Sequence, residues 1–130
     1  MIYRYMYFAD NISLEIAITQ TFKERNRGLL ALPKIRVDQG LLISPCRSVH
    51  TFAMQYPLDL VYLSKQLKVV KLVENLQPNR MSYALAGHST LELCAGTIER
   101  LQIKKDMQIT VTDLAPQSLI QRQSDEHEID

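Results

Sequence analysis

The chain has 130 residues, of which 46% are hydrophobic and 22% are charged, and its formal net charge at pH 7 is +1. This size and balance are typical of one globular domain and argue against a disordered chain. No uncharged apolar run reaches the ~18–20 residues that a membrane-spanning helix requires, and the N-terminus MIYRYMYFAD lacks the apolar core of a signal peptide. We therefore expect a cytoplasmic protein with no membrane partner.

Acidic residues are concentrated at the C-terminal end. The last six residues contain four acids, Asp125, Glu126, Glu128 and Asp130, and residues 1–123 carry fifteen bases against ten acids. Those bases are scattered, and none of the basic positions forms a run interleaved with aromatic residues, so no nucleic-acid partner is expected. Hydrophobic periodicity is lost after residue 115. We expect residues 1–115 to form a single domain and residues 116–130 to form a flexible acidic tail.

The first part of the chain predicts a β-hairpin followed by a helix. Residues 2–8 and 13–19 alternate between two faces, and the turn-forming pair Asp10-Asn11 lies between them. The first strand places three tyrosines on one face (Tyr3, Tyr5 and Tyr7), and we expect that face to be buried against the sheet.

The helix signal is a capping box, in which the Thr21 hydroxyl bonds the amide of residue 24 and the Glu24 side chain returns to the Thr21 amide. The helix is expected to run to about Leu32, because the following Pro33 disfavours continuation. Gly28 inside this range indicates close backbone packing or an earlier helix end.

The pattern returns to strands from residue 40 onward. We expect strands over 40–43, 58–63, 67–73, 90–94 and 107–114, a long loop over 75–88 and a short helical piece over 98–101. Many short strands with few helices predict a mainly β (α+β) fold, a compact antiparallel β-sandwich or barrel-like domain with one or two short helices.

Two carboxylates stand at unusual places in the apolar strands. Asp59 and Glu92 each lie between two leucines, and a buried carboxylate must be hydrogen-bonded, paired or protonated. The two could form an acid–base pair or hold a cation. Alternatively, each accepts hydrogen bonds from local backbone amides or pairs with Arg25 or Arg27. We expect structural anchoring for both.

The sulfur and imidazole groups do not form a familiar metal motif. Cys46, His50, His88 and Cys94 are spaced Cys-x3-His-x37-His-x5-Cys, which is not a usual zinc-finger spacing. We expect no metal, no other cofactor and two reduced thiols. His50 is interpreted instead as the polar rim of a pocket lined by Phe52 and Met54.

Five short motifs follow one another along the chain: Thr21-x-x-Glu24-Arg25-x-x-Gly28-Leu29-Leu30, Gly40-Leu-Leu-Ile43, His50-Thr-Phe-x-Met54, Pro57-Leu58-Asp59 and Leu91-Glu92-Leu93-x-Ala95-Gly96. In this order and spacing they resemble DUF192, a widespread prokaryotic family of undefined biochemical role. The resemblance extends from about Leu14 to Val111, and the motif that begins at His50 is similar to the family's shorter variant. It implies a compact, mostly β fold and brings no known reaction.

These residues suggest a binding protein rather than an enzyme. The candidate pocket residues are Arg25, His50, Met54, Asp59 and Glu92, and none is assigned a catalytic role. We expect a non-enzymatic domain of a bacterial cytoplasmic protein that binds a small ligand or serves as an accessory domain, as a monomer or weak dimer. Two alternatives remain: a small hydrolase or metal-assisted enzyme that uses Asp59, Glu92 and His50, and a protein–protein adaptor whose acidic tail docks on a basic partner.

Overall fold

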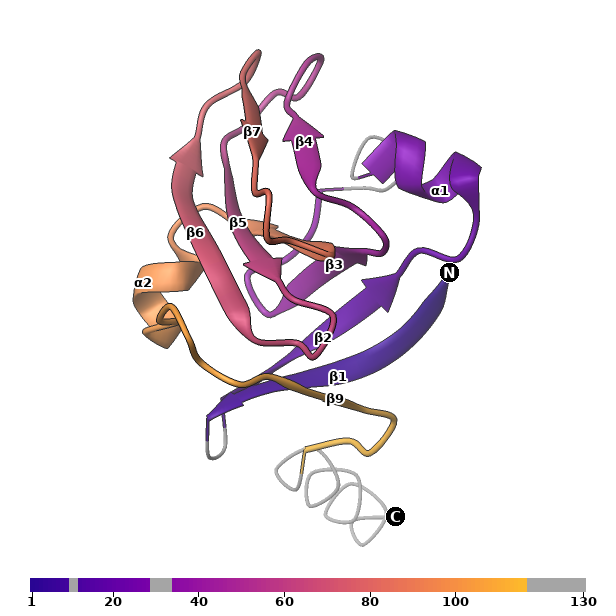
Figure 1. Ribbon diagram of the computed structural model, residues 1–130, viewed down its shortest axis with the longest axis vertical. Helices are drawn as coiled ribbons and strands as arrows, with labels where there is room; N and C mark the ends of the chain where they lie inside the picture. Colours follow the sequence, from indigo (N-terminus) through magenta and orange to yellow (C-terminus); the bar gives the residue numbers. More distant parts are fainter. Residues whose placement is uncertain (10–11, 29–33, 117–130) are drawn as a thin grey trace, which may run out of the picture.

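The computed structural model describes residues 1–9, 12–28 and 34–116 (Figure 1). Its elements in chain order are β1 (Ile2–Ala9), β2 (Ile12–Ile18), α1 (Phe22–Arg27), β3 (Gln39–Ile43), β4 (Ser48–His50), β5 (Leu58–Leu63), β6 (Val69–Leu76), β7 (Met81–Tyr83), β8 (Ser89–Cys94), α2 (Thr97–Leu101) and β9 (Thr110–Thr112). In these ranges no helix is long and apolar enough to cross a membrane. The tail expected over 116–130 lies outside them, apart from Pro116.

Seven strands form one curled sheet in the order β6-β5-β8-β3-β2-β1-β9, and β4 pairs with β7 in a separate two-stranded sheet. Neighbouring strands are antiparallel except β2 and β3, whose parallel pairing requires a long connection, here the segment that contains α1. The curl brings the two ends of the large sheet together, where Val69 N–H donates to the Met107 carbonyl at 2.9 Å. The prediction of a mainly β, barrel-like domain with short helices is confirmed.

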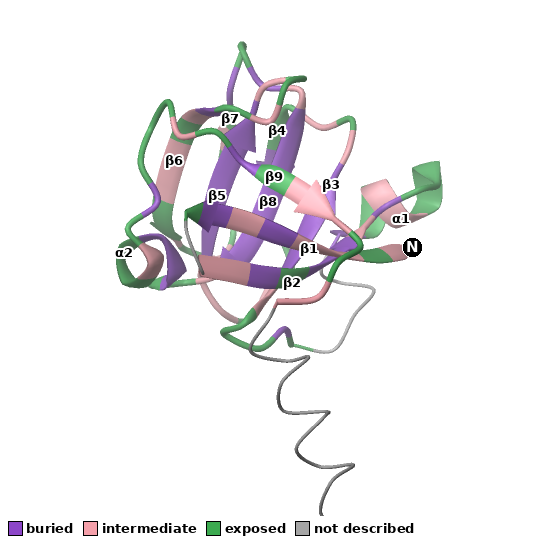
Figure 2. Ribbon diagram, turned by 90° about the horizontal axis from the view of Figure 1, so that it is seen from below, coloured by how far each residue is buried: buried purple, intermediate pink, exposed green. Residues whose placement is uncertain are grey.

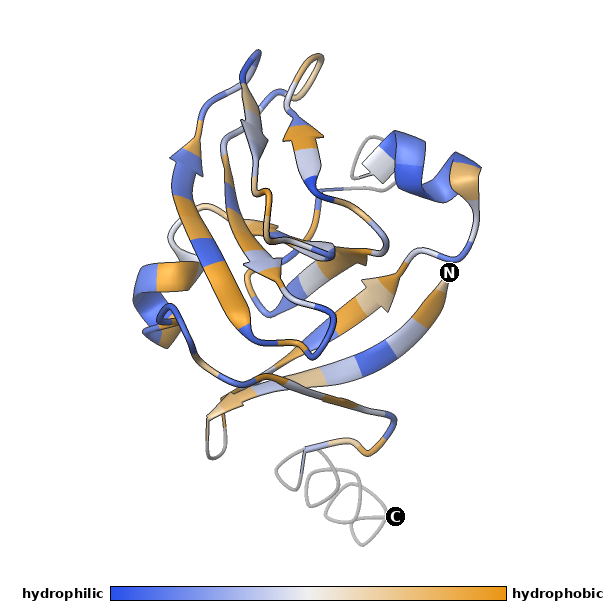
Figure 3. Ribbon diagram, in the orientation of Figure 1, coloured by the Kyte–Doolittle hydropathy of each residue, from blue (hydrophilic) through white to orange (hydrophobic). Residues whose placement is uncertain are grey.

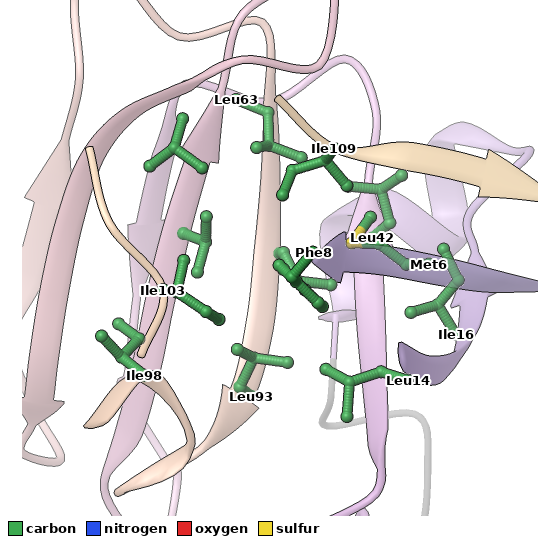
Figure 4. Packing of buried hydrophobic residues seen from close by; sticks show 13 residues of the cluster. Met6, Phe8, Leu14, Ile16, Leu42, Leu63, Leu93, Ile98, Ile103 and Ile109 are labelled. Carbon is green, nitrogen blue, oxygen red and sulfur yellow. The ribbon is translucent and has the colours of Figure 1, made fainter. Parts of the chain in front are cut away.

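The central strands are buried on both faces, as Figure 2 shows for β5 and β8. Such strands contain nearly continuous apolar sequences, because neither face meets water. Alternate residues of β5 therefore belong to two separate cores. Val61 and Leu63 belong to the core inside the curl, where Leu63 lies near Met6 and Phe8 of β1 (Figure 4). The alternate residues Leu58, Leu60 and Tyr62 point to the opposite face and pack in the core that includes Val49 of β4.

The N-terminal hairpin of β1 and β2 is confirmed, and its expected turn at Asp10-Asn11 lies outside the described residues. The prediction that the tyrosine face of β1 is buried is wrong. Met6 and Phe8 on the other face are in the core, whereas Tyr3 is 62% exposed. A period of two separates the faces of a strand without showing which one points inward, and the more apolar side chains occupy the inner face.

Helix α1 begins at the predicted capping box. The Thr21 hydroxyl accepts from the Glu24 amide at 3.1 Å, and the Glu24 carboxylate accepts from the Thr21 amide at 3.2 Å. The helix ends at Arg27 rather than near Leu32, because Gly28 has φ +54° and ψ −138°, and residues 29–33 lie outside the described range. α1 is mostly hydrophilic (Figure 3) and contains no buried residue.

The expected long loop over 75–88 is partly wrong. β6 continues to Leu76, and β7 occupies Met81–Tyr83, where it pairs with β4. Neither β4 nor β7 is expected from the sequence, because each is only three residues long and is defined by a partner about thirty residues away in the chain. Met81 of β7 is 70% exposed, so its side chain does not belong to the core. The last strand is also shorter than expected, since β9 covers only Thr110–Thr112.

Candidate functional site

A pocket of about 220 Å³ lies where the end of α1 meets β4 and the large sheet. Four of the five candidate residues line it: Arg25, His50, Met54 and Glu92. They come from α1, β4, the segment before β5, and β8, so only the tertiary structure brings them together. The fifth candidate, Asp59, is not among the lining residues.

Two arginines, Arg25 and Arg27, line the side of the pocket formed by α1. Arg25 is half-buried and Arg27 is exposed. Within the described part of the chain, neither side chain has an ion pair or a hydrogen bond. A guanidinium group presents a planar fork of donors that matches a carboxylate or phosphate. This side of the pocket is therefore suited to an anionic group.

The carboxylate of Glu92 lies at the buried side of the pocket, since this residue is only 5% exposed. Gly28 packs directly against it: a Cβ atom at Gly28 would lie 3.5 Å from Oε1 of Glu92 and 3.6 Å from Cδ1 of Ile43. The left-handed φ of Gly28 is a conformation that side chains other than glycine rarely adopt. The backbone turn after α1 thus covers a buried carboxyl group.

Apolar side chains form the remaining walls, mainly Ile43, Val49, Met54 and Leu58. Val49 and Leu58 are buried, and Met54 is half-buried. The pocket therefore combines an acidic floor, apolar walls and a basic side. A small number of convergent polar groups on an apolar wall is the usual pattern of small-molecule sites.

His50 lies at the exposed end of β4, and its ring stacks on Phe52 with the ring centroids 5.0 Å apart and an interplanar angle of 23°. Phe52 is not among the lining residues and is 46% exposed, so its expected place in the pocket wall is not observed. No hydrogen bond holds the imidazole within the described residues. His50 thus has the geometry of a polar rim.

Asp59 has a different environment, although it is also completely buried. Its Oδ1 accepts from the Asn75 amide at 2.9 Å, and its Oδ2 accepts from the amides of Gly96 at 3.0 Å and Ile98 at 2.9 Å. These bonds connect β5 to the end of β6 and to the start of α2. Three backbone donors on one carboxylate are an anchoring arrangement.

The two carboxylates lie on opposite faces of the sheet. In the pairing of β5 with β8, Asp59 is directly opposite Leu93, and Glu92 is opposite Leu60. Residues directly opposite one another share a face, and successive residues alternate between faces. Asp59 therefore points into the curl with Leu93, while Glu92 points toward the pocket. The strand register therefore separates the two carboxylates that the sequence offers as a possible acid–base pair.

Both thiols are free. Cys46 lines the pocket, and its Sγ donates to the Ser48 carbonyl at 3.0 Å. Cys94 Sγ donates to the Ile35 carbonyl at 3.1 Å, and burial raises the pKa of this thiol. Among the residues that the structure describes, no three His, Cys, Asp or Glu side chains are grouped so that they could hold a metal ion.

Several lining residues were not identified from the sequence as part of a site. Arg27 and Gly28 follow Arg25 in the first motif, and the expectation of close packing at Gly28 was the available signal. Cys46 and Ser48 belong to a segment for which no strand was expected. They reach the pocket because β4 pairs with β7 and lies beside α1.

Two solved structures show the same fold. One is a crystal structure of a "putative transcription regulator" from Sinorhizobium meliloti 1021, with a TM-score of 0.73 and 20% sequence identity over 86% of this chain and 95% of that chain. The other is a protein of unknown function from Novosphingobium aromaticivorans DSM 12444, with a TM-score of 0.70 and 17% identity over 84% of each chain. At these identities the likeness concerns the fold alone.

No curated protein matches the sequence. The model of the DUF192 family, described as an uncharacterized ACR, matches residues 7–111. That range runs from β1 to β9 and contains the capping box, Gly28 and every element that lines the pocket. The resemblance inferred from the five motifs is thereby confirmed: the chain belongs to the DUF192 family.

Proposed function

We propose that this protein binds a small polar molecule in the pocket between α1 and β4 and does not transform it. The observation that carries the proposal is that two arginines and a buried glutamate, Arg25, Arg27 and Glu92, line one pocket with apolar walls. The volume of about 220 Å³ lies below the roughly 300–1,000 Å³ of typical sites for drug-sized ligands. The ligand is therefore smaller than the drug-sized molecules that larger pockets accept.

The arrangement of the potentially reactive side chains supports binding without chemistry. A catalytic nucleophile is expected to contact a base, and that base to be oriented by a third group. The Cys46 thiol donates instead to a backbone carbonyl, and the His50 ring stacks on Phe52. Asp59, which the enzymatic alternative requires, faces the other side of the sheet. We place the function in the cytoplasm, which suits two free thiols.

The experiment is a titration of isotope-labelled protein, followed through its backbone amide resonances, with four probes of similar size. The probes are alanine, propionate, ethylamine and propionamide, which present a zwitterion, an anion, a cation and a neutral amide. We expect at least one probe to cause saturable shifts at the amides of Gly28, Ser48 and His50, and none at Thr110 of β9.

Arg25→Gln is the informative variant, because it removes a charge from the pocket. Arg36→Gln is its matched control, since Arg36 is exposed, pairs with Asp38 at 3.3 Å and does not line the pocket. The first variant should weaken the response to the probes that carry a carboxylate, and the second should leave every response unchanged. The absence of saturable shifts at the pocket amides with all four probes would contradict the proposed function.

A further inference from the structure

We propose that the ligand is a small zwitterion of the α-amino acid class, with its carboxylate at Arg25 and Arg27 and its ammonium group toward Glu92. This inference rests on the proposed function, because it identifies the chemistry of the same pocket. It follows from the opposite charges of the two sides of the pocket and from the short path of backbone that separates them.

The positive side lies on the last turn of α1, where both guanidinium groups lack an ionic partner among the described residues. Two like charges on one side of a small cavity favour an anion between them. A carboxylate fits best, because a guanidinium fork binds its two oxygens together. The other titratable groups that line the pocket are His50 at the exposed rim and Cys46, whose thiol already donates to the Ser48 carbonyl.

The negative side is the Glu92 carboxylate. A carboxylate has about four acceptor positions, so Glu92 can accept a hydrogen bond from a ligand in addition to the contacts that it already makes. Because Glu92 is 5% exposed, its electrostatic contact with a positive group is stronger than it would be in water, and this contact offsets the water that the positive group gives up. An ammonium group, which has only donors, is the natural complement.

The closeness of the end of α1 to Glu92 favours one ligand class. Gly28 follows Arg27 directly, and a Cβ atom at Gly28 would lie 3.5 Å and 3.7 Å from the two carboxylate oxygens of Glu92. The backbone that carries the basic side chains therefore lies next to the acidic side of the pocket. In an α-amino acid the ammonium and carboxylate groups are attached to one carbon atom, which suits this spacing. The apolar wall of Ile43, Val49 and Leu58 is available for a short aliphatic side chain.

Ligands with a single charge fit less well. A simple carboxylate satisfies the two arginines but brings no donor to Glu92, and a simple amine carries its positive charge into a pocket that already has two. The zwitterion satisfies both sides and carries no net charge into the pocket. The physical prediction is thus a preference for the zwitterion over either of its halves.

The test compares alanine with its two halves on the unmodified protein. Propionate is alanine without the ammonium group, and ethylamine is alanine without the carboxylate. We expect the dissociation constant of alanine, measured by amide shifts or calorimetry, to be at least about tenfold lower than those of both halves. The measurement needs no variant, so a failure to fold cannot obscure its result.

Two variants then assign the two sides of the pocket. Arg25→Gln should weaken alanine and propionate but leave ethylamine unchanged, whereas Glu92→Gln should weaken alanine and ethylamine but leave propionate unchanged or stronger. Arg36→Gln again serves as the control.

Equal binding of alanine and either half would overturn the zwitterion and leave the small-ligand function standing. Binding of propionamide alone would do the same. If none of the four probes binds, both the ligand class and the proposed function are wrong.

Discussion

Asp59 and Glu92 lie in two regions of the molecule that have similar local sequences but different environments. Both residues stand between leucines, in adjacent strands, and both are buried. Asp59 anchors the junction of β5, β6 and α2 through three backbone amides. Glu92 lies on the opposite face, beneath Gly28, at the floor of the pocket. A carboxylate in an apolar strand is therefore not informative by itself, because the face to which it points decides whether it bonds to the backbone inside the curl or lines the pocket.

The largest effect should come from Asp59→Ala. The change removes the acceptor of three backbone amides, those of Asn75 and Gly96 in part-buried bonds and that of Ile98 in a buried one. A buried donor left unsatisfied costs about 1–3 kcal/mol, and the two part-buried bonds add to this loss, so we expect a total of about 3 kcal/mol. Asp38→Ala and Asp113→Ala are the controls, because both side chains are exposed and solvent replaces their contacts within about 0.5 kcal/mol. Urea midpoints of the three variants test the comparison. An Asp59→Ala protein as stable as its controls would remove the anchoring role.

Two glycine substitutions test the same distinction between fold and pocket. Gly28 has φ +54° and Gly96 has φ +95°, so an alanine at either position is strained by about 1–3 kcal/mol. A Cβ atom would touch Glu92 and Ile43 at Gly28 but would meet nothing within 4 Å at Gly96. Both variants should lose stability to denaturant, and only Gly28→Ala should also change the amide shifts of Ser48 and His50. Equal shifts in both variants would show that Gly28 is not part of the pocket.

Isosteric replacement of the carboxylates gives a smaller effect. Asp59→Asn leaves one oxygen and one NH2 group facing the three backbone N–H donors, so at least one hydrogen bond is lost. Glu92→Gln keeps an acceptor in a pocket that water can enter. We expect Glu92→Gln to lose less than roughly half of the stability that Asp59→Asn loses. Denaturant midpoints measured in one buffer provide the ranking. The reverse order would make Glu92 the stronger anchor and weaken its assignment to the pocket.

The pH dependence of stability reports on the face that Glu92 occupies, because Cys94 lies two residues further along the same face of β8. Burial raises the pKa of Cys94 in the folded state. Its contribution is therefore fully present below the ordinary thiol pKa of about 8.5 and is lost as the pH rises through the higher folded value. We expect the free energy of unfolding to decrease above about pH 8.5.

Cys94→Ala should reduce the pH-dependent loss without removing it. Burial also raises the pKa of Tyr56 and Tyr62. Ionisation of these two phenols at alkaline pH therefore also destabilises the folded state, and this part of the loss remains in the variant. Urea midpoints at a series of alkaline pH values measure both slopes. Identical slopes for the variant and the original protein would show that Cys94 is not shielded from water.

The smallest effect is expected from deletion of residues 117–130. This segment has few apolar residues, so we propose that it is a flexible acidic tail and that its removal leaves the thermal midpoint nearly unchanged. A decrease of many degrees would show that it packs on the domain. If its acids neutralise the arginines of α1, deletion would instead strengthen alanine binding without affecting stability.

Local patterns in the sequence were sufficient for the architecture. The alternation over 2–8 and 13–19, the capping box at Thr21 and the apolar runs of β3, β5 and β8 all correspond to observed elements. These features depend on the chemistry of neighbouring residues, so they can be recognised without knowledge of the rest of the chain. They also led to four residues that line one pocket.

Tertiary structure decided which faces and segments meet. The inward face of β1, the pairing of β4 with β7 and the helix end at Gly28 each depend on distant partners. The separation of Asp59 from Glu92 shows the reason most clearly. Alternation fixes the face of each residue within its own strand, but comparing two strands requires their register, which is set by hydrogen bonds between β5 and β8. A shift of one residue would have placed both carboxylates on the same face.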